Sequence, residues 1–220
     1  MTSRTPSSSR RFAASVAVLA ALALLGTACT GGQAPPSAAP SDAPTSQSAP
    51  PTPSATPTPT ATASYKPADA KGRAQNVPVP VLPEAAKAKT KEGLEAFARY
   101  WYKLLNYSYE TGDLSRISSV SSSACALCSK VFPGIKKWHA EGRWIVGATI
   151  TVYAVQSTFV QTADDTFQVA IQSQQRSGAL KNPDGSDAQI VAESAMLGDL
   201  MIAQYKGGSW IAQNVDRLGG

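Results

Sequence analysis

The chain has 220 residues, of which 43% are hydrophobic and 16% charged, and this length allows one domain or a small domain with appended segments. Ten of its 16 prolines fall between Pro35 and Pro67, and three of its arginines lie in an N-terminal leader, so the net charge of +5 falls to +2 without that leader. Because nucleic-acid-binding proteins usually carry a basic patch or stripe, this balance indicates no nucleic-acid partner.

Residues 1–28 have the pattern of a secretory signal peptide. Three arginines precede an apolar stretch from Phe12 to Leu25, which is shorter than the roughly 20 residues that a transmembrane helix needs. The stretch runs into Leu25-Gly26-Thr27-Ala28-Cys29, where small residues ahead of a cysteine resemble a bacterial lipobox. We therefore expect lipidation of Cys29 and anchoring in a membrane, with two or more acyl chains. The alternative is an ordinary signal peptide cleaved near Ala28.

Residues 29–64 follow as a linker of Pro, Ala, Ser, Thr, Gly and Gln, with Asp42 as the only charged residue. Such a segment cannot bury enough apolar surface to offset its ordering entropy, so we expect it to be disordered. Its Thr-Pro and Ser-Pro clusters are also typical of O-glycosylated stalks. Residues 65–83 continue in extended form, and we expect the valines between Val77 and Pro83 to be buried along the domain.

Residues 84–220 remain for one folded domain, which is long enough for a single core. An apolar stripe at helical spacing runs from Leu94 to Leu105, with Thr90 as a candidate N-cap and Gly112 as the terminator. Asp113 can cap a second, short helix, and Ser121 to Ser123 can cap a third. Pro133 lies inside that third helix, so we expect a kink or two helical pieces there.

After Gly142 the hydrophobic period changes to two. The residues from Trp144 to Tyr153 predict one long strand, and the stretch from Phe167 to Gln172 predicts its partner after a turn at 163–165. Asn182-Pro183-Asp184-Gly185 is a strong turn signal inside a longer loop. Residues 200–205 and 210–215 predict a hairpin across Gly207-Gly208. Helices followed by an antiparallel meander indicate an α+β fold, with the helices packed on one face of the sheet.

This order of elements resembles the nuclear-transport-factor-2-like (SnoaL-like) superfamily, in which a curved antiparallel sheet holds N-terminal helices in its concave face as a cone. Residues 65–220 resemble more closely a family of uncharacterised secreted lipoproteins of high-GC Gram-positive bacteria, a domain of unknown function. The matching stretches include Gln75-Asn76-Val77-Pro78-Val79-Pro80, Leu94 to Trp101, Cys125-Ala126-Leu127-Cys128 and Trp138 to Trp144. The resemblance implies a fold and a location, and no known activity comes with it.

Two cysteines remain once Cys29 is lipidated. In an oxidising compartment the default for Cys125 and Cys128 is a disulfide, which would hold the start of the third helix. A redox-active Cys-x-x-Cys pair is the sharper alternative, but those pairs open a helix after a strand in a βαβ context that is absent here. Zinc is a further alternative, for which two thiols and a lone histidine supply only three of the four ligands that structural sites need.

The candidate pocket residues are mostly aromatic. Tyr100, Trp101, Tyr107, His139 and Asp199 are the residues that we expect at a pocket for a small apolar or sugar-like ligand. Trp138, Trp144 and Trp210 could also line such a pocket. The competing interpretation is that these aromatics form the core of a small domain. Ketosteroid isomerases show how a cone can host catalysis, with an Asp base and Tyr and protonated Asp donors in an apolar cavity.

No spacing ties these residues into a catalytic set, Asp199 could simply face solvent at the start of a strand, and no phosphate-binding loop or nucleophile elbow is visible. We therefore expect no cofactor and a non-catalytic, lipid-anchored domain at the extracytoplasmic face of the cell membrane. It would bind a small ligand or an envelope protein. The alternatives are an isomerase or hydrolase of the cone superfamily and a purely structural or assembly role.

Overall fold

The computed structural model of the chain describes residues 63–219. The expected signal peptide, Cys29 and the linker up to residue 62 lie outside the described residues. Within residues 63–219 the protein has three α-helices and two antiparallel sheets, which confirms the mixed α+β class. No helix in this part of the chain is both long and apolar enough to cross a membrane.

The first and longest helix, α1 (Lys91–Thr111), begins and ends where the sequence predicts. Thr90 caps it, because its Oγ1 accepts a 3.0 Å hydrogen bond from the backbone N–H of Gly93. Gly112 ends it in the left-handed conformation, with φ at 77°, which glycine adopts without steric cost. The predicted apolar stripe is buried throughout, so α1 contributes the largest share of the core: Leu94, Phe97, Ala98, Trp101, Leu104 and Leu105.

The segment before α1 differs from expectation. Val79 and Val81 are 39% and 83% exposed, so the prediction that these valines are buried is wrong. Pro78 and Pro80, next to these valines, have no N–H group with which to pair against a strand. This segment, residues 65–83, is called the lead-in below. Polar contacts hold it to the domain, such as the 2.8 Å hydrogen bond from the indole Nε1 of Trp144 to the carbonyl of Asp69. A short 3₁₀ helix, η1 (Glu84–Lys87), then leads into α1 and was not predicted.

Two further helices follow α1. Asp113 Oδ1 accepts a 2.8 Å bond from the backbone N–H of Ser115, where α2 (Ser115–Ser119) begins. The third helix, α3 (Ala126–Ala140), is capped by Cys125 and not by the preceding serines, so that prediction is wrong. It runs as one helix through Pro133, not as two pieces. Pro133 and Ser129 are both exposed, so water can reach the carbonyl that the proline leaves without an intrahelical partner.

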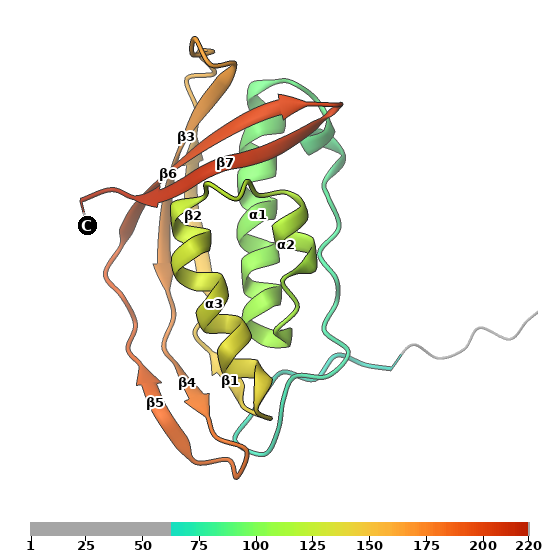
Figure 1. The fold of residues 1–220 in the computed structure, drawn as a ribbon, viewed down its shortest axis with the longest axis vertical. Coiled ribbons are helices and arrows are strands. Elements are labelled where there is room, and N and C mark those ends of the chain that lie inside the picture. Colours follow the sequence, from blue (N-terminus) through green and yellow to red (C-terminus); the bar gives the residue numbers. More distant parts are fainter. Residues whose placement is uncertain (1–62, 220) are drawn as a thin grey trace, which may run out of the picture. The chain divides into compact units, whose positions relative to one another are not determined.

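The strands form a four-stranded and a three-stranded sheet, and all their pairings are antiparallel. The larger sheet has the order β2 (Ile150–Gln156), β3 (Thr166–Gln175), β6 (Leu197–Lys206) and β7 (Ser209–Arg217). The smaller has the order β1 (Trp144–Gly147), β4 (Gly178–Lys181) and β5 (Asp187–Val191). Figure 1 shows the smaller sheet at the opposite end of the domain from the β6–β7 turn.

The single strand predicted from Trp144 to Tyr153 is wrong. The chain leaves one sheet at Gly147 and enters the other at Ile150, with positive φ at Gly147 (65°) and Ala148 (54°). Pairing nevertheless continues across the bend, since the Ala148 N–H donates to the carbonyl of Ser177 at 3.1 Å and Arg176 N–H to that of Thr149 at 2.8 Å. Two residues in the left-handed conformation therefore change the direction of the strand. The alternation of hydrophobic residues in the sequence continues through them.

The three predicted turns are confirmed, and the one at 163–165 precedes β3. Gly207 and Gly208 join β6 to β7 with φ of 60° and 81°, as a tight hairpin between right-twisted strands requires. The Asn182–Gly185 turn joins β4 to β5, and its Gly185 N–H donates to the carbonyl of Asn182 at 2.9 Å. The strands on either side of the Asn182–Gly185 turn were not predicted, because each is only four or five residues long.

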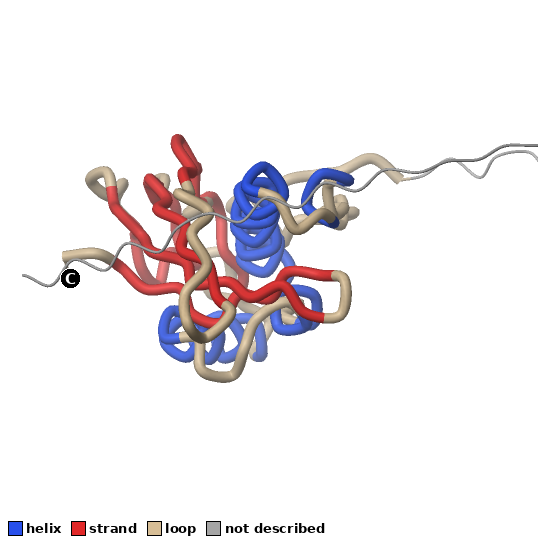
Figure 2. Tube along the Cα trace, turned by 90° about the horizontal axis from the view of Figure 1, so that it is seen from above, coloured by secondary structure: helices blue, strands red, loops and turns tan. Residues whose placement is uncertain are grey.

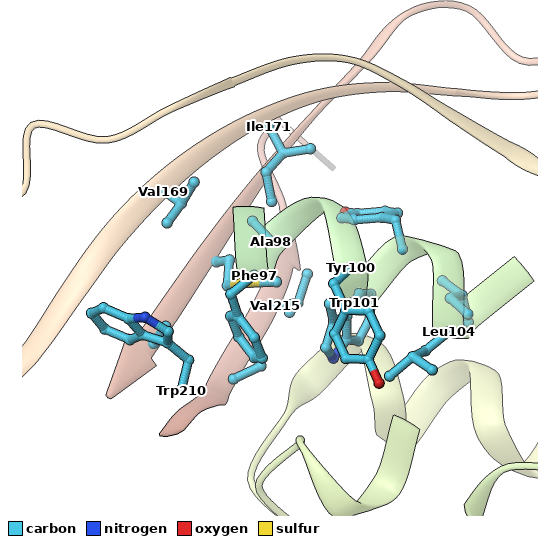
Figure 3. Close-up of a cluster of buried hydrophobic side chains, with 14 of the residues drawn as sticks. Phe97, Ala98, Tyr100, Trp101, Leu104, Val169, Ile171, Trp210 and Val215 are labelled. Carbon is cyan, nitrogen blue, oxygen red and sulfur yellow. The ribbon is translucent and has the colours of Figure 1, made fainter. Parts of the chain in front are cut away.

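The core lies between α1 and the larger sheet. On β3, Phe167, Val169 and Ile171 are buried and alternate with exposed Gln168, Ala170 and Gln172, as predicted. Viewed from above in Figure 2, α1 is seen nearly end-on beside the strands, and α3 lies on the other side of the β6–β7 hairpin. Figure 3 shows aromatic and aliphatic side chains from α1, β3 and β7 gathered into one cluster.

Candidate functional site

Tyr100 and Trp101 belong to the hydrophobic core. They are 8% and 0% exposed and lie in the cluster of Figure 3 beside Phe97 and Leu104. The indole Nε1 of Trp101 donates a 2.8 Å hydrogen bond to Oγ of Ser121, which satisfies its one polar atom. Trp210 is likewise 2% exposed. Tyr100, Trp101 and Trp210 are therefore core residues, as the competing interpretation of the sequence has it.

Tyr107 lies apart from them. It is half-buried on α1, in a shallow hollow of about 350 Å³ that the lead-in covers with Val77 to Pro80. Tyr65 borders the same hollow, and its hydroxyl donates a 2.8 Å hydrogen bond to Oε2 of Glu110. Burial and this carboxylate raise the pKa of Tyr65 to about 12. The bond from Tyr65 to Glu110 ties the lead-in to α1, and none of the other predicted pocket residues lines this hollow.

Asp199 is not the solvent-facing residue that the sequence allowed, because its side chain is fully buried on β6. Its Oδ2 accepts hydrogen bonds from Tyr102 Oη and Ser173 Oγ, both at 2.8 Å. Its Oδ1 lies 3.3 Å from the guanidinium Nε of Arg217, which is 42% exposed. Three groups, from α1, β3 and β7, thus share the one carboxylate on β6.

The tyrosine that reaches this aspartate is Tyr102, which sequence reasoning missed in favour of Tyr100. Burial first, and then the negative charge of Asp199 with its hydrogen bond, raise the pKa of the Tyr102 hydroxyl far above its usual value. Tyr102 and Tyr109 are seven positions apart and share a face of α1, but Tyr100 and Tyr107 have the same spacing, so the sequence held no signal that selected Tyr102. A proton donor, a carboxylate and an arginine are therefore assembled here, but the carboxylate has no exposed surface through which a substrate could reach it.

His139, the only histidine, lies where α3 meets the end of α1. Its Nε2 is 3.0 Å from the carbonyl oxygen of Tyr109, one of the last carbonyls of that helix, and therefore donates to it. Its Nδ1 is buried without a partner in the described residues. Burial lowers the pKa of the ring, and nearby Arg73 lowers it further, against the opposing effect of the carbonyl. A Cβ at Gly112 would meet the ring at 2.7 Å, so His139 packs directly on the glycine that ends α1.

A cavity of about 480 Å³ lies between α3 and the smaller sheet. Most of its lining is apolar and comes from five elements that are distant in sequence: Tyr109 from α1, Val131, Ile135 and Trp138 from α3, Ile145 from β1, Leu180 from β4 and Val191 from β5. A volume in this range fits a small organic ligand. Of the aromatic residues considered from the sequence, only Trp138 lines this cavity.

The polar groups at this cavity are few. Burial raises the pKa of the Tyr109 hydroxyl, and that hydroxyl makes no hydrogen bond with any residue of 63–219. Gln175 and Gln189 are the two amides, and Gln175 already donates to the carbonyl of Ala148. The charged lining residues are Lys130, Lys137 and Arg143, all of them basic.

The cysteines of α3 lie away from this cavity. Cys125 and Cys128 are at disulfide distance, with their sulfurs 2.02 Å apart, and Cys125 Sγ accepts a 3.2 Å bond from the N–H of Cys128. Both are buried, at 1% and 6% exposure, so the pair closes the first turn of α3 against the core. Across residues 63–219, no three His, Cys, Asp or Glu side chains gather into a group that could hold a metal ion.

Comparison with known proteins identifies a family and leaves its activity open. The model of a family of unknown function (DUF6318) matches residues 63–216. The comparison with curated proteins gave no match.

Among solved structures, the intermembrane space region of the chloroplast protein ARC6 is similar at 9% identity and a TM-score of 0.42, over 60% of this chain and 98% of that one. The protein Aln2 from a Streptomyces species is similar at 7% identity and a TM-score of 0.38, over 57% of this chain and 89% of that one. Likenesses this distant carry no argument about function.

Proposed function

The chain belongs to the DUF6318 family of unknown function, and we propose that it is a lipid-anchored protein of the cell envelope whose folded domain binds a small ligand without transforming it. The leader, the lipobox that ends at Cys29 and the linker to residue 64 support an extracytoplasmic address. A linker of that composition would let the domain search the space above the membrane while it stays tethered.

The cavity between α3 and the smaller sheet is the observation that carries the binding role. It is the described hollow with the most apolar side chains from separate elements, and it has a small number of polar groups, as ligand pockets do. Asp199, the one buried carboxylate among residues 63–219, accepts hydrogen bonds from three donors and has no exposed surface. A domain that has a cavity, and in which the Tyr102–Asp199 pair is kept away from solvent, is suited to binding and not to turnover.

We also infer that the fold is the cone of the nuclear-transport-factor-2-like superfamily. Three features support this: α1 packs on the inward face of the larger sheet, the ladder bends at Gly147 and Ala148, and the smaller sheet continues beyond the bend. Such a cone is open at the end opposite its narrow end. On this inference, the cavity beside β1, β4 and β5 lies at the open end.

The address is tested on the native protein by mass spectrometry of its N-terminal peptide. We expect an N-terminal Cys29 carrying a diacylglycerol thioether and an acylated amine, and loss of membrane association in a Cys29→Ser variant. Two results together would contradict the lipid anchor. The N-terminus would be cleaved near Ala28 and carry no acyl group, and the parent chain and Cys29→Ser would show the same membrane association.

Binding is tested on the mature chain with Cys29→Ser, which removes the acyl chains and the need for detergent. A panel of envelope-derived small molecules is screened by thermal shift against the chain and against a Gly134→Trp variant. Gly134 lines the cavity and a Cβ there would meet nothing within 4 Å, so an indole is introduced at a position where the backbone leaves room for a side chain. Ligands that stabilise the chain and not the variant support the proposal, whereas no cavity-dependent ligand across the panel would reject it.

An isomerase or hydrolase is the second candidate, and the Tyr102–Asp199 hydrogen bond is the observation that favours it. That pair resembles the donor and carboxylate of cone-fold isomerases. For Asp199 to act in catalysis, its carboxylate would have to become accessible to a substrate. A substrate that binds equally well to the chain and to Asp199→Asn, but turns over only in the former, would establish the enzyme. Equal behaviour of the two variants in binding and turnover would exclude Asp199 from catalysis.

A further inference from the structure

We propose that the cavity between α3 and the smaller sheet binds an amphiphile with an apolar chain and one carboxylate, as in a long-chain fatty acid. This inference rests on the proposed binding function and specifies its ligand. It is argued from the apolar floor of the cavity, the charge of its rim and the shortage of polar partners inside it.

The floor of the cavity requires an apolar ligand body. Ile135 and Ile145 are 3% and 6% exposed, and Val131, Leu180 and Val191 are half-buried around them. Each such side chain gains when a ligand replaces water over its remaining surface, at about 25 cal/mol for each Å² of apolar area. A cyclic sugar would instead leave many of its hydroxyl groups without partners inside the cavity, since Tyr109 and Gln189 are the only uncharged polar lining side chains with no hydrogen bond to residues 63–219.

The charge at the rim requires an anionic head group. The residues of α3 include Lys130, Lys136 and Lys137 and no acidic residue, and two of these lysines line the cavity with Arg143. Lys137 makes no ion pair within residues 63–219, and the nearest carboxylate to Lys130 is 3.9 Å away on exposed Asp216. A cation at this rim would meet three like charges, and a neutral head group would leave Lys137 without a counter-charge.

Arg143 adds geometric specificity for a carboxylate. Its guanidinium lies over the Trp138 ring, 4.9 Å from the centroid, so the plane is held at the edge of the cavity. The same guanidinium pairs at 2.7 Å with Glu141, whose side chain is 66% exposed. A planar fork of donors matches a carboxylate in two places, and an incoming head group would compete with Glu141 for it.

The experiment measures binding of three probes with the same twelve-carbon tail by isothermal titration calorimetry on the mature Cys29→Ser chain: dodecanoate, dodecanol and dodecyltrimethylammonium. We expect dodecanoate to bind about tenfold more tightly than dodecanol, as one charge-assisted hydrogen bond supplies. We expect the quaternary ammonium probe to bind more weakly than either. Gly134→Trp should abolish the binding of all three.

Matched variants at the rim separate the head group from the tail. Lys137→Gln should weaken dodecanoate about tenfold and leave dodecanol unchanged, whereas Lys136→Gln, on the same helix but outside the cavity lining, should change neither. Glu141→Gln should strengthen dodecanoate binding several-fold, because it removes the competitor for Arg143. If these residues had a purely structural role, Lys137→Gln and Glu141→Gln would not change the affinity for dodecanoate in opposite directions.

Two kinds of failure remain distinguishable. Equal affinity for dodecanoate and dodecanol, with no effect of Lys137→Gln, would overturn the carboxylate and leave a neutral apolar ligand in the cavity. No binding of any probe, together with a panel that shows no ligand sensitive to Gly134→Trp, would overturn both this inference and the proposed function. Binding of dodecanoate that persists in Gly134→Trp would place it elsewhere and overturn the inference alone.

Discussion

The hydroxyl of Tyr102 on α1 donates a 2.8 Å hydrogen bond to Oδ2 of Asp199 on β6, 97 positions later in the chain. The same oxygen accepts from Ser173, and the other carboxylate oxygen contacts Arg217. A single fully buried carboxylate thus joins the long helix to three neighbouring strands of the larger sheet.

Removal of this carboxylate should destabilise the domain strongly. Asp199→Ala leaves the buried Tyr102 and Ser173 hydroxyls without their acceptor, and we expect a loss of about 3 kcal/mol in the free energy of unfolding. Urea denaturation of the mature chain measures it. Asp216→Ala is the matched control on the next strand, since Asp216 is exposed and its ion pair is long, and it should change the free energy by less than about 0.5 kcal/mol. Similar effects of the two variants would contradict a structural role for Asp199.

Stability should fall as the pH drops below the ordinary pKa of histidine. The folded protein holds the pKa of His139 below its usual 6.5 because burial disfavours the charged ring. In that range the unfolded chain therefore binds more protons than the folded one. The contribution is complete above about pH 6.5 and is lost as the pH falls toward the lower pKa of the folded state.

His139→Gln, which keeps a donor near the Tyr109 carbonyl, should show a smaller fall than the parent chain between pH 7.5 and pH 5.5, measured by urea denaturation at each pH. Asp69, Asp113 and Asp184 also have lowered pKa values, but their contributions are lost only at more acidic pH, below their ordinary 3.8. Equal pH profiles for the two proteins would show that His139 does not carry this dependence.

The cysteine pair should contribute little to global stability. It closes a loop of only a few residues, so the chain-entropy model gives at most about 2 kcal/mol. A double Cys125→Ala, Cys128→Ala variant should remain folded, lose no more than that amount, and become insensitive to dithiothreitol. Circular dichroism with and without the reductant checks this, with the parent chain as the sensitive control. Unfolding of the variant at neutral pH would mean that the start of α3 depends on the bond.

The bend between the sheets should tolerate no side chain at Gly178. A Cβ there would collide with the backbone N–H of Ala148 and the carbonyl of Val146, neither of which can move without breaking the ladder. We expect Gly178→Ala to cost about 2 kcal/mol or more. Gly134→Ala is the opposite case, because nothing lies within 4 Å of the added atom on an exposed helical turn, and it should stabilise by up to about 1 kcal/mol. Thermal unfolding of both variants checks the contrast, and equal effects would contradict the packing at the bend.

Local patterns in the sequence were sufficient for α1, its caps at Thr90 and Gly112, the alternation on β3 and the β6–β7 turn. Each of these depends on residues within a few positions of one another, through helical spacing, a side-chain cap or the left-handed preference of glycine. The α+β class follows from the same signals, because the helical spacing ends before the alternating one begins.

Only the tertiary structure decided where the ladder bends, which tyrosine meets Asp199, and which aromatics are core. Residues 144–153 keep a period of two through Gly147 and Ala148, so the change of sheet leaves no mark on the hydrophobic pattern. Tyr100 and Tyr102 carry the same chemistry two positions apart, and the packing of α1 on β6 selects between them. The cavity draws its lining from six elements, and side chains that distant in the chain are brought together by folding alone.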